Sequence, residues 1–117
     1  MKKLFFIFLL GYVYQISDAQ SISADAAKNF IDSTKTVCGK VADTYLMQNG
    51  SLFINFSKPY PKQLFTAIIK AKDLKVFNYD VEKAIINKEI CVIGLIKLYE
   101  GSPEIYITSP DQLQISK

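Results

Sequence analysis

The sequence of 117 residues contains no histidine, no arginine and no tryptophan. Without histidine, the side chain best suited to proton transfer near neutral pH is missing, and so is the commonest metal ligand. Two cysteines are too few for a structural zinc site, which takes four ligands. The acidic residues are scattered, and there is no calcium loop or glycine-rich phosphate loop. Unless carboxylates distant in sequence converge, these absences predict a protein that is not an enzyme and binds no metal or cofactor.

The charge of the chain is nearly balanced. All 14 basic residues are lysines, and they face 11 acidic residues, so the formal net charge is +3. A dedicated nucleic-acid-binding domain is usually much more basic. Charge alone therefore does not predict a nucleic-acid ligand.

The first 19 residues have the layout of a secretory signal peptide. Lys2 and Lys3 precede an apolar run from Leu4 to Val13, and small residues follow at 17–19. This run is shorter than the roughly 20 apolar residues that a membrane-spanning helix needs. We therefore predict cleavage after residue 19, a single domain over residues 20–117 without a membrane anchor, and a periplasmic or secreted location.

In most of the remaining chain, apolar and polar residues alternate as they do in β-strands. Asn-Gly at 49–50 predicts a hairpin turn, and two prolines at 59 and 61 predict a loop. Strands are expected over 36–45, 52–56, 64–70, 89–99 and 104–108, with short helices over 24–31 and 81–87 and a packed tail around Leu113 and Ile115. Three strands, a helix and two strands predict an all-β small barrel. This is the order of the five-stranded Greek-key OB-fold, here with an added short N-terminal helix.

Two of these strands carry a cysteine close to a glycine. Gly39 and Gly94 predict sharp coiling or a close approach of the backbone. Cys38 and Cys91 lie on neighbouring strands of an OB barrel, both pointing away from the aliphatic side. Export favours a disulfide, but both cysteines come early in antiparallel strands, which could hold them too far apart to bridge. A disulfide and two buried thiols both remain open.

Three stretches carry a family resemblance that covers nearly the whole mature chain. Residues 36–41, 53–66 and 98–105, with the Lys-Pro-Tyr-Pro loop and the Tyr-x-Gly-x-Pro hairpin, resemble small exported bacterial OB-fold domains described as nucleic-acid-binding or nuclease-associated. The resemblance implies the OB-fold and a nucleic-acid ligand. Glu100 and Ser102 stand where such domains often carry positive residues, which disfavours nucleic acid at that edge.

The candidate ligand-binding residues lie on the second strand and the loop after it. OB-folds usually bind on the outer face of strands two and three, where aromatic rings beside lysines suit a single-stranded nucleic acid. The alternatives are structural: the N-terminal helix could cover Phe53, and Tyr60 could plug a barrel end. A second patch is expected on strands four and five. The two groups are Phe53, Asn55, Lys58, Tyr60 and Lys62, and then Lys97, Tyr99 and Tyr106.

Two functions follow from these residues. The first is a non-catalytic module that binds single-stranded nucleic acid with weak sequence selectivity outside the cytoplasm. The alternative is a periplasmic interaction domain whose ligand is a protein, peptide or oligosaccharide, which suits the nearly balanced charge better. The oligomeric state does not follow from the sequence.

Overall fold

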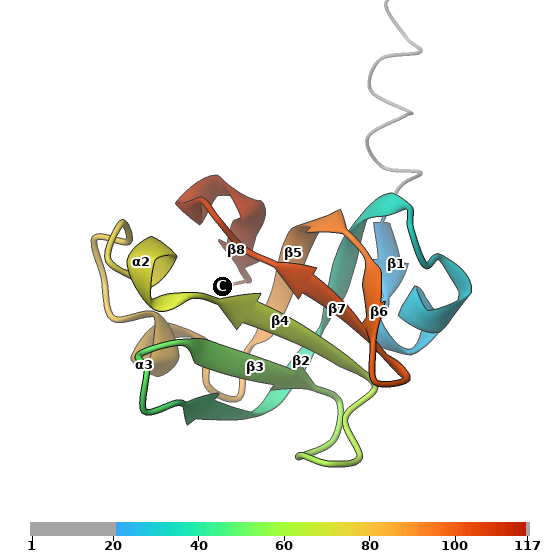
Figure 1. The fold of residues 1–117 in the computed structure, drawn as a ribbon, viewed down its shortest axis with the longest axis horizontal. Coiled ribbons are helices and arrows are strands. Elements are labelled where there is room, and N and C mark those ends of the chain that lie inside the picture. Colours follow the sequence, from blue (N-terminus) through green and yellow to red (C-terminus); the bar gives the residue numbers. More distant parts are fainter. Residues whose placement is uncertain (1–20, 117) are drawn as a thin grey trace, which may run out of the picture.

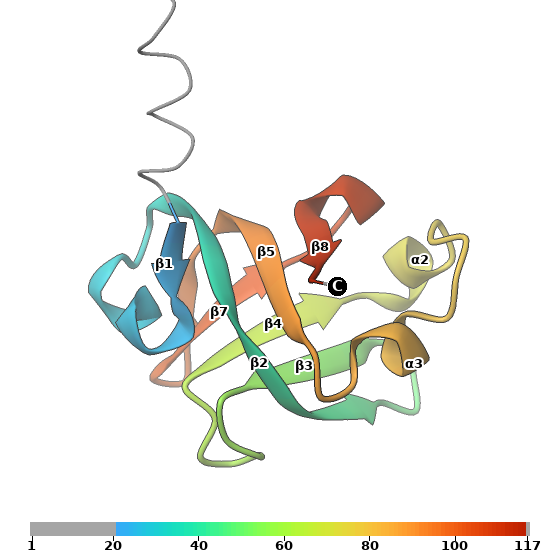
Figure 2. The ribbon, with the colours of Figure 1, turned by 180° about the vertical axis from the view of Figure 1, so that it is seen from behind.

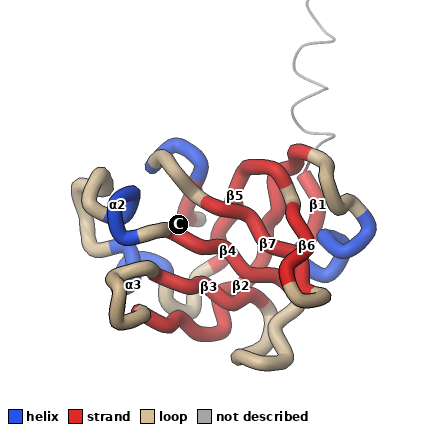
Figure 3. The backbone as a smooth tube through the Cα atoms, viewed as in Figure 1, coloured by secondary structure: helices blue, strands red, loops and turns tan. Residues whose placement is uncertain are grey.

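A computed structural model describes residues 21–116 of the protein, and the predicted signal peptide lies outside the described residues. Eight strands dominate, and short helical turns lie around them: α2 and α3 at one end, η1 at the other, and η2 next to β8 (Figure 1, Figure 3). Within residues 21–116, no helix is long and apolar enough to cross a membrane. The elements are β1 (Ser21–Ser23), η1 (Ala24–Asn29), β2 (Thr34–Leu46), β3 (Leu52–Phe56), β4 (Phe65–Ile69), α2 (Ala71–Leu74), α3 (Val81–Ile85), β5 (Glu89–Leu95), β6 (Lys97–Tyr99), β7 (Ser102–Tyr106), η2 (Pro110–Gln112) and β8 (Leu113–Ile115).

The strands follow the order β6-β7-β4-β3-β2-β5-β8, and β1 pairs with β2 in addition. All neighbours are antiparallel except β4 with β7 and β1 with β2. Although β5 and β6 lie towards opposite ends of this order, only Ile96 separates them in the chain. The sheet therefore curls round: β3, β4 and β7 cross the front in Figure 1, and β2 and β5 come to the front when the molecule is turned (Figure 2). The chain has the OB-fold, as predicted.

The core fills the inside of this curled sheet. Alternate residues Leu52, Ile54 and Phe56 of β3 point inward and are fully or almost fully buried, as their spacing predicts. From α3, Val81 and Ile85 close one end, and the Asp80 carboxylate caps this helix by accepting from the backbone N–H of Lys83 at 3.3 Å.

Both strand glycines lie where another part of the chain comes close. A Cβ on Gly94 would lie 2.6 Å from Cγ2 of the buried Ile105, and one on Gly39 would lie 3.1 Å from Cβ of Ala24. Of the expected causes, close approach is the one that the structure supports at both positions: a side chain at Gly94 would collide with Ile105, and one at Gly39 would be in tight contact with Ala24.

Cys38 and Cys91 form a disulfide with a Cα–Cα distance of 4.0 Å. The register places Cys38 directly opposite Cys91, between the pairs Val37–Val92 and Gly39–Ile90. The two cysteines are therefore close enough to bridge, although both come early in their strands. Since β2 begins at residue 34 and meets the start of β5 at Lys40, the early residues of β5 face the middle of β2.

Several elements differ from the predictions. An unbroken strand over 89–99 would put Leu98 on the same side as Ile90 and Val92, facing the core. The strand is instead broken at Ile96, whose backbone N–H donates to the Ser33 carbonyl, and Leu98 is 57% exposed. The N-terminal helix is a 3-10 helix, and the Ser23 side chain makes no capping bond to its backbone. The elements β1 and α2 and the pairing of β8 with β5 were not expected. The pairings of β1 with β2 and of β8 with β5 join segments that are separated in sequence, which local patterns do not reveal.

Candidate functional site

A β-bulge in β2 decides which residues reach the outer face of the sheet. Val41 pairs with Phe56 of β3, but the next paired residue is Asp43 with Asn55, so Ala42 is an extra residue. Beyond this bulge the alternation of β2 is shifted by one. Asp43 and Tyr45 therefore lie on the outer face, whereas continued alternation from Val37 and Val41 would have turned them inward.

Apolar and aromatic side chains form a row across the outer face of four strands. In register, Tyr45 of β2 lies beside Phe53 of β3, Phe53 beside Ile68 of β4, and Ile68 beside Tyr106 of β7. The tyrosines are substantially exposed, Tyr45 by 62% and Tyr106 by 42%. We call these four residues the aromatic row.

A parallel set of polar side chains, which we call the polar row, comprises Asp43, Asn55, Thr66 and Glu104. Asn55 and Thr66 are buried. The side-chain amide of Asn55 donates to Asp43 Oδ1 at 2.9 Å, and the Thr66 hydroxyl donates to Asn55 Oδ1 at 3.2 Å. These bonds satisfy polar groups that would otherwise be costly to bury.

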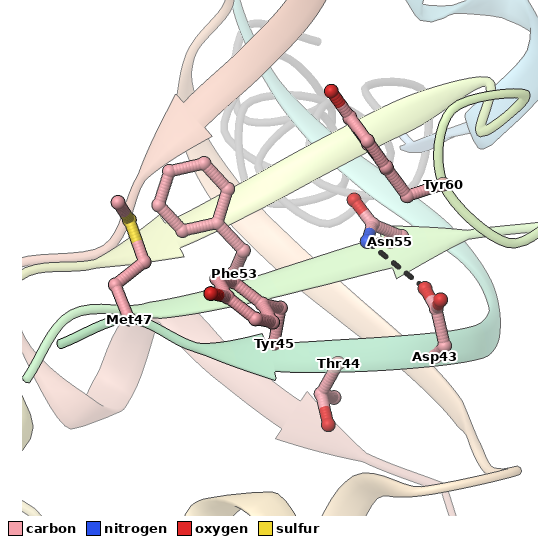
Figure 4. Close-up of a pocket in the computed structure, with 7 residues that line it drawn as sticks. All are labelled: Asp43, Thr44, Tyr45, Met47, Phe53, Asn55 and Tyr60. Atoms are coloured by element: carbon pink, nitrogen blue, oxygen red, sulfur yellow. Dashed lines mark hydrogen bonds between the residues drawn. The ribbon is translucent and has the colours of Figure 1, made fainter.

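The rows border two hollows that meet at Met47 and Phe53. The first hollow has a volume of about 420 Å³, and Figure 4 shows the Asp43 carboxylate and the Asn55 amide beside one another on its wall. The second hollow, of about 300 Å³, continues across β3 and β4 to Tyr106. The first is lined by Asp43, Thr44, Tyr45, Met47, Phe53, Asn55 and Tyr60.

Three lysines belong to segments beside this surface, but only Lys70 lines a hollow. Lys70, which lines the second hollow, places its ammonium 5.1 Å from the centre of the Tyr106 ring, within the range of a cation–π interaction. Lys58 and Lys62 are exposed in the loop between β3 and β4, on either side of Tyr60. The cations lie at the two ends of the face, and the carboxylates of the polar row lie between them.

The structure brings four of the predicted residues together: Phe53, Asn55 and Tyr60 at the first hollow, and Tyr106 at the second. Phe53 is not covered by η1, whose Ala24 packs at Gly39 instead. Tyr60 is 71% exposed and so does not plug the barrel. Both structural alternatives for these aromatic residues are therefore excluded.

Lys97 and Tyr99 lie at the edge of the same face, on β6, but line neither hollow. The Lys97 ammonium lies 3.5 Å from the Asp32 carboxylate. The second predicted patch is therefore divided, because Tyr106 lies in the aromatic row and the other two residues lie beyond Glu104.

Sequence reasoning missed Asp43, Tyr45, Met47 and Lys70 as residues of this surface. Alternation continued from Val37 and Val41 would turn the first two inward, so it does not indicate that they belong to this surface. The Asn49-Gly50 turn gives no signal either: a two-residue turn would place Tyr45 opposite Ile54, in agreement with that alternation, whereas the structure has a three-residue loop over 48–50 and Tyr45 opposite Phe53.

Glu104 is the most buried acidic side chain of this face, only 6% exposed. Burial raises the pKa of its carboxyl group, and the nearby negative charge of Glu100 raises it further. Lys97 pairs with Glu104 in register on β6, but its ammonium is beside Asp32, while Thr66 on the β4 side is uncharged. The charged form of Glu104 is therefore disfavoured in the folded protein.

Replacing Glu104 by Gln is expected to increase the free energy of unfolding at neutral pH and to change it little in acid. A carboxyl group whose pKa is raised in the folded state stabilises the fold when protonated, and this contribution is lost as the pH rises through the folded pKa. Gln imitates the protonated form at every pH. Urea unfolding of both proteins at about pH 7 and about pH 4 measures the difference. The control is Glu89→Gln, at an exposed position; an equal effect of Glu104→Gln at both pH values would contradict the prediction.

No protein-family model matches the sequence, and no curated protein matches it either. Solved structures do match. Asparaginyl-tRNA synthetase from Pyrococcus horikoshii superimposes with a TM-score of 0.56 at 12% identity, covering 82% of this chain and 23% of the synthetase. A protein from Leishmania major described as an aspartyl-tRNA synthetase gives a TM-score of 0.52 at 12% identity, over 81% of this chain and 20% of its own. The chain thus spans about a fifth of the length of these enzymes.

A smaller protein is similar over most of its length. OBody AM1L10, in a structure with hen egg-white lysozyme bound, gives a TM-score of 0.54 at 15% identity and covers 77% of this chain and 85% of its own. At such low identities these similarities concern the fold alone.

Within residues 21–116, no three His, Cys, Asp or Glu side chains are grouped so that they could hold a metal ion.

Proposed function

We propose that this chain is a non-catalytic binding module for single-stranded nucleic acid, acting outside the cytoplasm. The observation that carries the proposal is the aromatic row beside the first hollow, with Lys70 at its Tyr106 end and with Lys58 and Lys62 exposed in the loop that carries Tyr60. Exposed rings allow bases to stack and lysines bind phosphates, which together suit a single strand without requiring a fixed sequence. This is also the face on which OB-folds bind oligonucleotides.

The similar structures support the proposal only at the level of the fold. Two of them are aminoacyl-tRNA synthetases, enzymes that act with a nucleic acid, and the similarity covers about four fifths of this chain. Export rests on the signal-peptide pattern of residues 1–19 and on the resemblance to exported bacterial OB-fold domains.

A protein, peptide or oligosaccharide ligand is the second candidate. It is favoured by the first hollow, which is lined by the Asp43 carboxylate and no lysine. The structure of OBody AM1L10 with lysozyme also indicates that proteins of this fold can bind a protein. Such a ligand lacks the row of phosphates that would pair with the lysines, so its affinity would depend little on salt.

Fluorescence anisotropy with a labelled single strand of about 12 nucleotides, within the site sizes known for OB-folds, tests the proposal. If three lysines contact phosphates, affinity is expected to fall about 20-fold between about 50 and 200 mM salt, since each contact to a single strand adds about 0.7 to the slope of log affinity against log salt. Lys62→Ala should reduce that slope by about 0.7. Absence of binding at the lower salt concentration would overturn the proposal.

Two matched variants act as controls in the same experiment. Lys83→Ala removes an exposed lysine on α3, outside both hollows, and should leave the slope unchanged. Tyr60→Ala should weaken binding about tenfold, a typical effect of losing one stacked base. Tyr99→Ala, at a tyrosine that is 57% exposed but lines neither hollow, should have no such effect.

A further inference from the structure

Three hydrogen bonds run in one direction from Gln63, through Thr66 and Asn55 of the polar row, to the carboxylate of Asp43. The Gln63 amide donates to the Thr66 hydroxyl at 3.3 Å, Thr66 donates to Asn55, and Asn55 donates to Asp43. Asp43 determines this direction. Because an ionised carboxylate only accepts, Asn55 must present its N–H₂ to Asp43 and its oxygen to Thr66.

As a result, the polar group that the row offers to a ligand is an acceptor. Asn55 and Thr66 are buried, 3% and 2% exposed, and bond to each other. Asp43 is partly exposed on the wall of the first hollow, and only its Oδ1 receives a hydrogen bond from the described residues. No lysine of residues 21–116 lies within ion-pair distance of it. Its second oxygen is free to accept, and Oδ1 retains one further acceptor site beside the bond from Asn55.

Besides Asp43, Thr44 and the buried Asn55, the first hollow is lined by three aromatic residues and Met47. Tyr45 is 62% exposed and Tyr60 is 71% exposed, and Phe53 lies beside Tyr45 in register. Figure 4 shows the Phe53 ring and Met47 at one end of the hollow and Tyr60 and Asp43 at the other. A ligand that fits this arrangement has a planar ring to stack and N–H donors at its edge to meet the carboxylate.

We infer that the first hollow binds a guanine base of the single strand, with Asp43 accepting from its Watson–Crick edge; this inference rests on the proposed function. Guanine has two adjacent donors, N1–H and the 2-amino group, which match both oxygens of a carboxylate. Adenine and cytosine each place an amino group beside a ring nitrogen that accepts. In thymine and uracil the single N–H lies between two carbonyl oxygens, which the carboxylate repels.

The lysines distinguish guanine from the other planar group with paired donors, the guanidinium of arginine. An arginine-containing protein segment would bring positive charge towards Lys58 and Lys62, on both sides of Tyr60, and Lys70 at the second hollow. A nucleic-acid strand brings phosphates towards the same three lysines. The three lysines outnumber Asp43 and Glu82, whose carboxylate accepts from the Thr44 hydroxyl at 2.7 Å, and this balance favours the nucleobase.

The experiment compares three DNA strands of about 12 nucleotides by anisotropy: all thymidine, thymidine with two central guanines, and the same strand with inosine at those positions. The wild-type protein is expected to bind the guanine strand about tenfold more tightly than thymidine, the discrimination typical of a bidentate base contact. Inosine lacks the 2-amino group, so its strand should lose most of that preference.

Asp43→Asn should abolish the preference for guanine and retain binding of the thymidine strand, because it keeps the size of the side chain and removes an acceptor. Glu89→Gln, which removes the same charge from an exposed position outside both hollows, should keep the preference. Far-UV circular dichroism verifies that the Asp43 variant is folded; if it is not, the three strands on the wild-type protein decide alone.

Each outcome has a definite meaning. Equal affinity of the wild type for the three strands, or a preference that survives in a folded Asp43→Asn variant, would overturn the guanine inference and leave the proposed function standing. No binding of any strand would overturn the proposed function itself. If an arginine-containing tripeptide competes with the guanine strand while lysine peptides do not, and the inosine strand binds as well as the guanine strand, the hollow is an arginine site and the inference is wrong.

Discussion

Replacing Cys38 and Cys91 together by Ala is expected to lower the free energy of unfolding by about 4 kcal/mol. The two cysteines are 53 residues apart in sequence, and the disulfide restricts the unfolded chain by closing that loop. Domains of this size are commonly stabilised by only about 5–15 kcal/mol, so the loss is a large part of the total. Urea unfolding measures it, with the midpoint and slope determined for both proteins.

The double variant should nevertheless fold and keep its binding surface. The backbone pairs on both sides of the disulfide, Val37 with Val92 and Gly39 with Ile90, do not depend on the sulfur atoms. Neither cysteine lines a hollow. A reductant should destabilise the wild-type protein by a similar amount. It should leave the variant unaffected, and this control shows that the reductant acts through the disulfide. Equal stability of the wild type with and without reductant would contradict the prediction.

The second large effect is expected from Phe56→Ala, which should lower the free energy of unfolding by about 3–5 kcal/mol. Phe56 is fully buried, and its ring packs edge-to-face on Phe65 at 5.0 Å between centroids. It also meets Gly39, whose added Cβ would lie 3.2 Å from the Phe56 ring. Three strands converge on this ring, because Val41, Phe56 and Phe65 are paired in register. Removing it leaves a cavity that the barrel cannot close without moving all three strands.

Phe53→Ala is the matched control, because it removes the same side chain from the same strand on the opposite face. Phe53 is partly exposed and lines both hollows. Its loss should lower stability much less than that of Phe56 and weaken oligonucleotide binding about tenfold. Phe56→Ala, studied at a temperature where it remains folded, should bind like the wild type. If the two variants lose stability equally, the assignment of the two faces of β3 is wrong.

The bounds of β3 and the cap of α3 could be predicted because they depend on local features. Alternation over 52–56 and the Asn-Gly turn before it define the strand, and Asp80 caps a helix that begins at the next residue. In contrast, the break at Ile96 depends on a backbone hydrogen bond to Ser33, more than 60 residues away. No pattern within 89–99 indicates it.

The candidate site was only partly predictable for a similar reason. Phe53, Asn55 and Tyr60 were found because they lie on one strand and on the loop that follows it. Tyr106 was found too, but it was grouped with Lys97 and Tyr99, since the parallel pairing of β4 with β7 that puts it beside Ile68 joins distant segments. Asp43 and Tyr45 were missed because one extra residue, Ala42, reverses the alternation of β2.

By itself, the sequence determined the order of the five main strands and the helix α3 among them, the inward side of β3, and the lack of histidine-based chemistry, because each depends on residue types and short-range spacing. Only the tertiary structure decided that Cys38 lies opposite Cys91, that the bulge turns Asp43 outward, and that one carboxylate orients a hydrogen-bonded row across three strands. These features depend on register between strands. Register is set when the sheet curls and the core packs, and a shift of one residue would reverse every side chain concerned.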